Sequence, residues 1–343
     1  MIKNNIGLEG IAFVEFATNK PEWMTKLFFE FGFSLLKKHQ TKNIQYFKQN
    51  NIQLFMNAEA NSFGGQFTEA HGPSICSMGW KFSDAEKAYK LAVSKGAKPA
   101  SKKDYDVPAI FGIGDSLIYF LDNKNMGQGW DSLGFKNLPK QIINPSKGYL
   151  EIDHLTNNVY KGTMGQWAEF YKNIFEFTDV RYFDIKGKQT GLVSHALRSP
   201  DGSFCIPINE ADEKKSQINE YLDQYNGPGI QHLAFLTKDI LTSLKQMKDS
   251  SVQMLDIDKD YYKTAFQRAP GLKQSKEEVE QFSVLVDGDE HGYLLQIFTQ
   301  NIIGPIFFEI IQRENNLSFG EGNFQALFNS IEREQEKRGV FKS

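Results

Sequence analysis

Hydrophobic residues recur along the chain in short runs that alternate between the periodicity of a strand and that of a helix. Gly10–Phe16 has the pattern of a strand, and Pro21 can open a helix because the apolar residues after it recur at helical spacing. A second cycle begins with the apolar run Gly72–Trp80 and a predicted helix over Ala85–Lys95. Between the two cycles, three apolar runs separated by polar turns predict short strands: Phe33–Lys38, Ile44–Lys48 and Ile52–Met56.

The second half of the chain repeats this pattern. Ile152-Asp-His154-Leu aligns with Ile11-Ala-Phe13-Val, and Gly227–Asp239 matches Gly72–Asp84 without a gap. The match includes the aspartate that can cap the following helix. Each half would then hold two strand–helix–strands modules, four in all, and would close its own sheet.

A polar segment separates the two halves. Asp122–Gly148 carries several glycines and prolines, which is typical of a connection between domains. We therefore expect an N-terminal barrel domain over residues 1–135, without metal, and a C-terminal catalytic barrel domain over residues 149–343.

Three polar side chains interrupt apolar, strand-like runs in the second half: His154, His232 and Glu309. Because strand side chains alternate, a curled sheet could aim the two imidazoles and the carboxylate at one point. Two histidines and one carboxylate suit non-haem Fe(II), and a metal would supply the cation that a buried Glu309 requires. Phe13 and Ser77 occupy the equivalent positions of the first half, which predicts metal ligands in one copy only.

Each of these side chains also has an ordinary structural interpretation. A histidine within a strand can be a hydrogen-bonded core residue, and Glu309 could pair with an arginine or face water. The same ligand types also accept Mn²⁺, Co²⁺ or Zn²⁺. A metal-free binding module is therefore an alternative, as we expect of the first half.

Composition excludes several other classes of protein. The net charge is −3 and no basic cluster is present, which argues against nucleic acid as a partner. An aromatic content of 13% is typical of a well-filled core. The two cysteines make no disulfide framework, and neither a signal peptide nor an apolar span of membrane length is found. We expect a cytoplasmic protein that does not bind membranes and forms a homo-oligomer, a dimer or a tetramer.

Further side chains of the second half are candidates for the lining of a site. Ser194, Asn209 and Gln296 lie inside predicted strands, although each could be satisfied at an edge. The last segment predicts a glycine-punctuated turn followed by an amphipathic helix. That helix either covers an open sheet mouth or is a lid whose first residues touch a ligand.

Eight short motifs lie within the second half: Ile152–His154, Arg181–Gly187, Pro207–Glu210, Lys215–Ile218, Gly229–Ala234, Leu294–Thr299, Ile306–Arg313 and Phe319–Phe324. Together they resemble the 4-hydroxyphenylpyruvate dioxygenase family, densely from about residue 149 to 338 and more loosely over 1–148. The resemblance implies an α+β fold of the vicinal-oxygen-chelate type. In that fold, four βαβββ modules build tandem open β-barrels, and a C-terminal helix lies over the second barrel.

The resemblance also implies roles for individual residues. His154, His232 and Glu309 would be the iron ligands, and Ser194, Asn209 and Gln296 would be catalytic. Gln231 would act through His232, since neighbouring strand residues point to opposite faces. The implied substrate-binding residues are Gln217, Gln231, Phe298, Phe307, Phe319, Asn323, Phe324 and Leu327.

The implied reaction uses one Fe²⁺ per chain, in the C-terminal domain. A 2-oxo acid substrate, 4-hydroxyphenylpyruvate, would react with O₂ to give homogentisate and CO₂, a step in tyrosine and phenylalanine catabolism. The aromatic residues would place the ring and exclude water.

Two related enzymes are alternatives within the same fold. Hydroxymandelate synthase would use the same ligands and substrate but oxidise the benzylic carbon. That family tends to carry an aliphatic residue where Phe298 stands here, so the phenylalanine favours ring hydroxylation. An extradiol ring-cleaving dioxygenase is disfavoured because the sequence offers no third pocket histidine.

Overall fold

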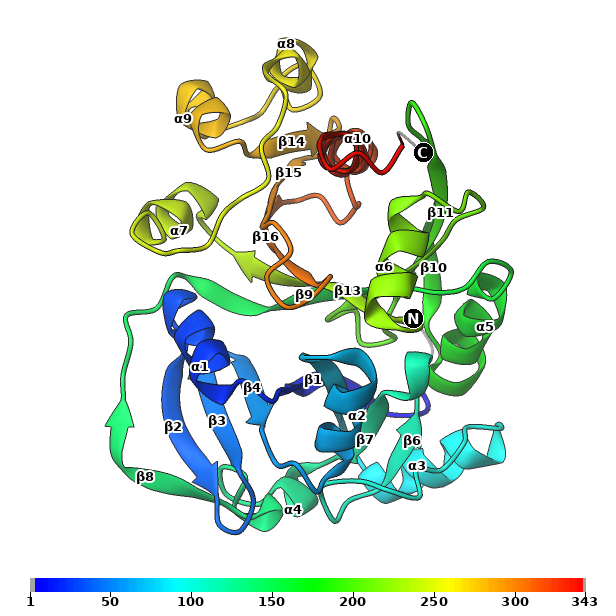
Figure 1. Cartoon of the computed structure of the whole chain (residues 1–343). Coiled ribbons are helices and arrows are strands. Elements are labelled where there is room, and N and C mark those ends of the chain that lie inside the picture. Colours follow the sequence, from blue (N-terminus) through cyan, green and yellow to red (C-terminus); the bar gives the residue numbers. More distant parts are fainter. Residues whose placement is uncertain (1–3, 342–343) are drawn as a thin grey trace.

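The first half of the chain forms one mixed eight-stranded sheet in the computed structural model, which describes residues 4–341 (Figure 1). The strands lie in the order β6-β7-β5-β1-β4-β3-β2-β8. At the centre, β1 pairs with β5 in antiparallel and with β4 in parallel orientation. The bounds are β1 Leu8–Ala17, β2 Ser34–His39, β3 Ile44–Gln49, β4 Ile52–Asn57, β5 Ser74–Phe82, β6 Ala109–Phe111, β7 Leu117–Leu121 and β8 Phe135–Ile142.

The second half forms a sheet of the same plan. Its order is β10-β11-β12-β9-β13-β16-β15-β14, and the central β9 again has one antiparallel neighbour, β13, and one parallel neighbour, β12. The bounds are β9 Tyr149–Asn158, β10 Thr178–Lys186, β11 Gly191–Arg198, β12 Cys205–Glu210, β13 Gly229–Thr237, β14 Leu285–Gly288, β15 Tyr293–Phe298 and β16 Phe307–Glu314.

Helices connect the strands into four modules, as predicted. Three modules are complete: β1-α1-β2-β3-β4, β9-α5-β10-β11-β12 and β13-α7-β14-β15-β16. The module that starts with β5 and α3 has only an isolated bridge between Pro99 and Ile110 where the others have a strand. The helix bounds are α1 Pro21–Glu30, α2 Phe63–His71, α3 Ala85–Ser94, α4 Asn123–Met126, α5 Met164–Phe175, α6 Gln217–Tyr225, α7 Ile240–Gln246, α8 Tyr262–Ala265, α9 Lys276–Gln281 and α10 Glu321–Lys337, with 3₁₀ turns η1 Ile113–Asp115, η2 Asp131–Leu133 and η3 Lys259–Tyr261. Within residues 4–341, no helix is both long enough and apolar enough to cross a bilayer.

The two halves share their irregularities as well as their strands. In the β1–β5 ladder, three residues have no partner: Glu9, Ala12 and Cys76. In the β9–β13 ladder, Leu150, Asp153 and Gln231 are skipped at the equivalent places. An unpartnered residue of this kind forms a β-bulge, which bends the strand and re-aims neighbouring side chains. The alignment of the halves therefore extends to the pairing of individual residues.

The segment expected to connect the halves is more ordered than the sequence indicated. Within Asp122–Gly148 the chain forms α4, η2 and β8, and β8 pairs with β2 at the edge of the first sheet. Most side chains of β8 are exposed, which explains why its composition is polar.

The backs of the two sheets pack on one another. On β13 and β16, Phe235 and Phe308 point towards the first half and meet Phe31, with ring centroids of Phe31 and Phe308 5.0 Å apart. Because strand side chains alternate, the next residues on these strands face the interior of the second half-barrel. One apolar core thus fixes the strands whose other face forms the site.

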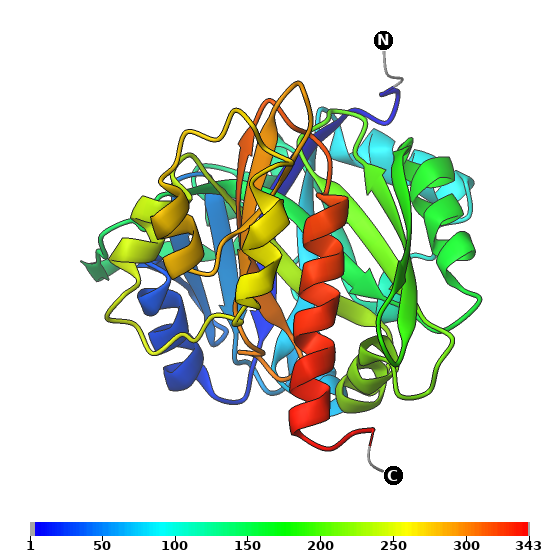
Figure 2. The same ribbon diagram turned by 90° about the horizontal axis from the view of Figure 1, so that it is seen from above.

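Helix α10 closes the second half-barrel. The two edge strands, β10 and β14, do not pair with each other, and α10 contacts both of them (Figures 1 and 2). Leu327 and Phe328 on the inner side of this helix are buried. The architecture is therefore the predicted one: two tandem open barrels with a C-terminal helix over the second.

Candidate metal centre and adjoining pocket

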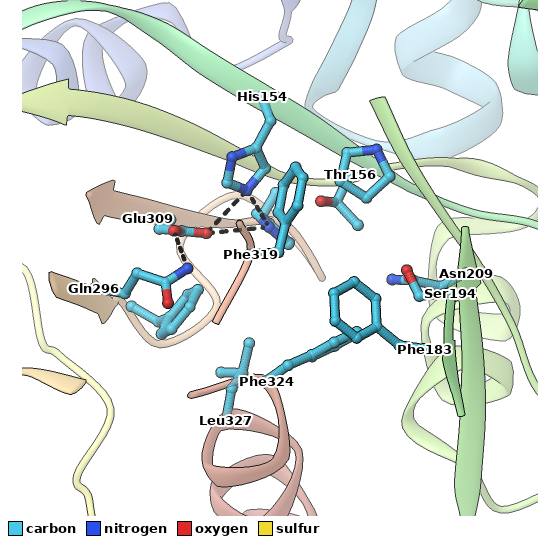
Figure 3. A pocket seen from close by; sticks show the side chains of 13 residues that line it. His154, Thr156, Phe183, Ser194, Asn209, Gln296, Glu309, Phe319, Phe324 and Leu327 are labelled. Atoms are coloured by element: carbon cyan, nitrogen blue, oxygen red, sulfur yellow. Dashed lines mark hydrogen bonds and ion pairs between the residues drawn. The ribbon is translucent and has the colours of Figure 1, made fainter. Parts of the chain in front are cut away.

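Three ligand-type side chains from adjacent strands converge inside the second half-barrel: His154 of β9, His232 of β13 and Glu309 of β16 (Figure 3). The Nε2 atom of His154 lies 3.0 Å from Oε2 of Glu309 and 3.3 Å from Nε2 of His232. Nε2 of His232 lies 3.4 Å from the same carboxylate oxygen. All three residues are buried, and one donor atom from each lies within 4.8 Å of the others. Donor atoms at this spacing can share one metal ion, since metal–ligand bonds to N and O are about 2 Å long.

The pairing register explains the convergence. His154 and Glu309 both lie opposite Ala234, one on each neighbouring strand. His232 precedes Ala234 by two residues and therefore shares its face. An alanine between the two larger side chains leaves space for them to approach each other.

A β-bulge precedes each histidine. Asp153 and Gln231 are the bulged residues, and each turns its side chain back to the imidazole that follows it. Oδ2 of Asp153 lies 2.7 Å from Nδ1 of His154, and Oε1 of Gln231 lies 3.1 Å from Nδ1 of His232. With an acceptor at Nδ1, each ring keeps its Nε2 lone pair for a metal.

The electrostatics of the group also suit a cation. Burial raises the pKa of Glu309, but His154 and His232 outweigh it and lower that pKa to about 2. Burial lowers the pKa of His154, but Glu309 and Asp153 outweigh it and raise that pKa to about 9, so a bound metal would take the place of the Nε2 proton. The carboxylate therefore stays ionised. Two imidazoles and an ionised carboxylate form a donor set that fits a divalent metal such as iron.

The three ligand-type side chains form one end of a pocket (Figure 3). At the other end, away from Glu309 and Gln296, lie Ser194 and Asn209. Oδ1 of Asn209 is buried and makes no hydrogen bond within the described residues. Between the ends, apolar side chains form the wall: Phe183, Pro207, Phe298, Phe319, Phe324 and Leu327.

Most site residues expected from the sequence line this pocket: His154, Ser194, Asn209, His232, Gln296, Phe298, Glu309, Phe319, Phe324 and Leu327. The others lie outside the lining. Phe307 stacks on the ring of His232 with centroids 4.7 Å apart, and Asn323 donates to Oε1 of Gln296 at 2.8 Å. Gln231 contacts His232 at Nδ1, away from the pocket. Gln217 is buried at the start of α6.

Three lining residues were not expected from the sequence: Thr156, Phe183 and Pro207. Thr156 follows His154 by two positions, and Pro207 precedes Asn209 by two. The two-residue period of a strand would have placed both on the inner face. Phe183 packs edge-on against Phe324 of α10, with ring centroids 5.3 Å apart, and this contact between distant segments leaves no local signal.

Comparison with known proteins defines the class of this fold and site. Residues 151–297 match the family model of the Glyoxalase/Bleomycin resistance protein/Dioxygenase superfamily. Residues 2–135 match the model described as the N-terminal part of hydroxyphenylpyruvate dioxygenase. A solved triple mutant of 4-hydroxymandelate synthase from Streptomyces coelicolor superposes with a TM-score of 0.79 at 25% identity, over 96% of this chain and 99% of that one. The chain is thus a vicinal-oxygen-chelate protein.

Two relatives narrow the class. Protein MelA of Shewanella colwelliana is 57% identical over 98% of this chain and 99% of the relative. The 4-hydroxyphenylpyruvate dioxygenase of Legionella pneumophila is 42% identical over 99% of this chain and 98% of the relative. The chain belongs to the 4-hydroxyphenylpyruvate dioxygenase family.

Proposed function

We propose that this protein is an Fe(II)-dependent dioxygenase that converts 4-hydroxyphenylpyruvate and O₂ to homogentisate and CO₂. The two-ended pocket is the observation that carries the proposal. Its ligand end suits the chelating 2-oxo acid, its apolar wall suits the aromatic ring, and its far end offers neutral polar groups to the phenol. A relative of 42% identity that bears this enzyme's name supports the same substrate.

His154, His232 and Glu309 would hold the metal. When bound, ferrous iron would supply the site at which a 2-oxo acid chelates and O₂ reacts. The protein's own contribution is to keep Glu309 ionised and both imidazoles oriented towards the same point.

A relay of hydrogen bonds fixes the carboxylate. The amide of Gln296 donates to Oε1 of Glu309 at 2.9 Å and accepts from Asn323 at 2.8 Å. The hydroxyl of Tyr261 lies 2.7 Å from Oδ1 of Asn323. Because this relay engages Oε1, Oε2 is left to face the histidines.

The remaining lining residues would bind and orient the substrate. Phe298, Phe319, Phe324 and Leu327 surround the space for the ring and exclude water from it. The unpartnered Oδ1 of Asn209 can accept a hydrogen bond from the phenol hydroxyl, an interaction that a buried acceptor favours. Ser194, paired with Asn209 in the β11–β12 register, can donate to the same hydroxyl.

The likeness to 4-hydroxymandelate synthase favours a second candidate, benzylic oxidation of the same substrate. Both reactions need the same ligands and differ in where the ring lies relative to the metal. Phe298, whose ring centroid is 6.2 Å from that of His232, limits the ring's position, and an aliphatic side chain there would leave more space. Its presence supports ring hydroxylation.

Product analysis separates these candidates. Metal-free protein, supplied with Fe²⁺ and 4-hydroxyphenylpyruvate under air, should consume one O₂ per substrate and yield homogentisate on chromatography. Omitting Fe²⁺, or adding a chelator in excess, should stop O₂ uptake. 4-Hydroxymandelate as the sole product would establish the second candidate. A chain that neither binds Fe²⁺ nor consumes O₂ would be a metal-free binding module.

A further inference from the structure

A buried ion pair lies directly behind the metal ligands. Oδ1 of Asp153 accepts a hydrogen bond from Nε of Arg313 at 2.7 Å, and Oδ2 accepts one from Nη2 at 2.8 Å. The same Oδ2 lies 2.7 Å from Nδ1 of His154. Only 10–11% of either charged side chain is exposed. The Asp153 carboxylate is therefore bonded both to Arg313 and to the imidazole of His154. The hydrogen bonds of the Arg313 side chain go to Asp153 and to two backbone carbonyls, so Arg313 is not the arginine partner considered for Glu309.

The segment that leads into α10 fixes Arg313 in turn. Its Nη1 donates to the backbone carbonyls of Asn316, at 3.2 Å, and of Ser318. The guanidinium lies 5.6 Å from the ring centroid of Phe319, whose ring is in turn 5.2 Å from that of His154. The guanidinium of Arg313 is thus fixed by the backbone on one side and bonds to both oxygens of Asp153 on the other. This pairing sets the orientation of the Asp153 carboxylate.

Fold stability alone does not account for this pair. Buried ion pairs can often be replaced by apolar residues without loss of stability, because desolvation offsets the attraction. The first half keeps the same bulge but has Ala12 where the second half has Asp153. The bulge therefore forms without a carboxylate, and the charged residue occurs only in the copy that has the histidine ligands.

We propose that Asp153 and Arg313 are positioning residues of the metal centre. Asp153 accepts a hydrogen bond from the Nδ1–H group of His154, which fixes the tautomer that presents Nε2 to the metal, and Arg313 holds Asp153 in the required orientation. This inference rests on the proposed function, because it assumes that His154 is a ligand. Hydrogen bonds of this type to metal-bound histidines typically contribute about 10–100-fold to metal affinity.

Substitution at both positions tests the proposal without leaving a buried charge. Asp153→Ala alone leaves Arg313 short of acceptors, and an unpaired buried guanidinium threatens folding. The double variant Asp153→Ala/Arg313→Met removes both charges and the acceptor at Nδ1, and Ala12 at the equivalent bulge shows that an alanine fits there. Asp179→Ala is the matched control, since Asp179 also lies 2.7 Å from a histidine nitrogen, Nε2 of His195, but in an exposed pair outside the pocket.

Co²⁺ titration of the full metal-free chain gives the readout. Visible absorption of bound Co²⁺ reports both affinity and ligand geometry, and thermal melts without metal check that each variant folds. We expect the double variant to bind Co²⁺ about 10–100-fold more weakly, with an altered spectrum. Asp179→Ala should bind like the unmodified protein.

The possible results distinguish failure of the positioning role of Asp153 and Arg313 from failure of the proposed dioxygenase function. Unchanged affinity and spectrum in a folded double variant would show that the pair is structural only, while the proposed function stood. An equal loss of affinity in Asp179→Ala would likewise contradict a specific role for Asp153. Absence of Co²⁺ and Fe²⁺ binding by the unmodified protein would overturn both proposals.

Discussion

The two half-barrels have the same strands and bulges but differ in what fills them. The registers make Phe13, Ser77 and Tyr119 the counterparts of His154, His232 and Glu309. In the second half these positions surround a pocket; in the first half they contribute to a packed interior. The scaffold alone does not make a site.

The first half-barrel has no room for a ligand at these positions. The ring of Phe13 stacks on Phe55 with centroids 4.2 Å apart, and Trp130 packs edge-on at 5.7 Å. Gly79 stands where the second half has Ala234, and a Cβ atom there would lie 2.3 Å from Cε1 of Phe13. Strand β5 of the first half therefore carries a smaller residue at this position, and its two neighbouring strands carry larger ones. A metal centre requires unfilled space as well as ligands.

A buried acid remains in the first half nevertheless. Glu15, the counterpart of Thr156, accepts hydrogen bonds from Tyr105 at 2.6 Å, from Asn57 at 3.0 Å and from Ser77. Burial, reinforced by Asp104, raises the pKa of Glu15 to about 7. One interior satisfies a carboxylate with neutral donors, whereas the other uses imidazoles. The pKa of about 2 keeps Glu309 fully ionised at neutral pH, whereas the pKa of about 7 leaves Glu15 only partly ionised.

The largest difference in turnover between the two halves should come from replacing Glu309 in the second half and its counterpart Tyr119 in the first. Glu309→Gln should lower homogentisate formation by at least about 10³-fold, because several kcal/mol of metal-dependent stabilisation would be lost. Tyr119→Phe, at the equivalent position, should leave turnover within about twofold of the unmodified protein. O₂ uptake and product yield measure both. A comparable loss in Tyr119→Phe would mean that the first half takes part in the reaction.

The buried acid of the first half should make stability depend on pH. Glu15 has a pKa of about 7 in the folded chain against 4.5 as the ordinary value, so the folded state retains this proton to higher pH. The free energy of unfolding should therefore fall as pH rises from about 4.5 to 7, by on the order of 3 kcal/mol.

Glu15→Gln should remove this dependence. Urea denaturation of both proteins at pH 5 and pH 8 measures it, with the exposed Glu86→Gln as control. The unmodified protein should lose stability relative to Glu15→Gln between the two pH values. Parallel changes in all three would show that Glu15 titrates alike in the folded and unfolded chains.

The smallest effect concerns the wall of the pocket. Phe324→Leu should raise KM for 4-hydroxyphenylpyruvate about 3–10-fold, because an aromatic contact worth about 0.5–1.5 kcal/mol is lost, with little change in kcat. Phe111→Leu, in the first sheet and outside the pocket, should leave KM unchanged. Steady-state kinetics measures both. An unchanged KM in Phe324→Leu would place the substrate ring away from α10.

Much of this arrangement could be predicted from the sequence. The repeat predicted the four modules, and strand alternation predicted that His154, His232 and Glu309 face one interior. The bulges could not be predicted, because they depend on how two strands pair rather than on local composition. In the sequence, the only indication of the positioning role proposed for Asp153 was therefore its place next to His154. β8 was missed for another reason: an exposed edge strand has the polar composition of a connection.

One further consequence follows from the helix that spans β10 and β14. In a fully closed barrel, strand number and stagger set the internal width, so a larger interior requires a rearranged ladder. Here the backbone pairing ends at two free edges, and a helix docked through side chains completes the enclosure. Substitutions along one face of α10 can therefore reshape the chamber while every strand stays paired. A change in the shape of the pocket at α10 would therefore leave the strands that carry His154, His232 and Glu309 paired as they are.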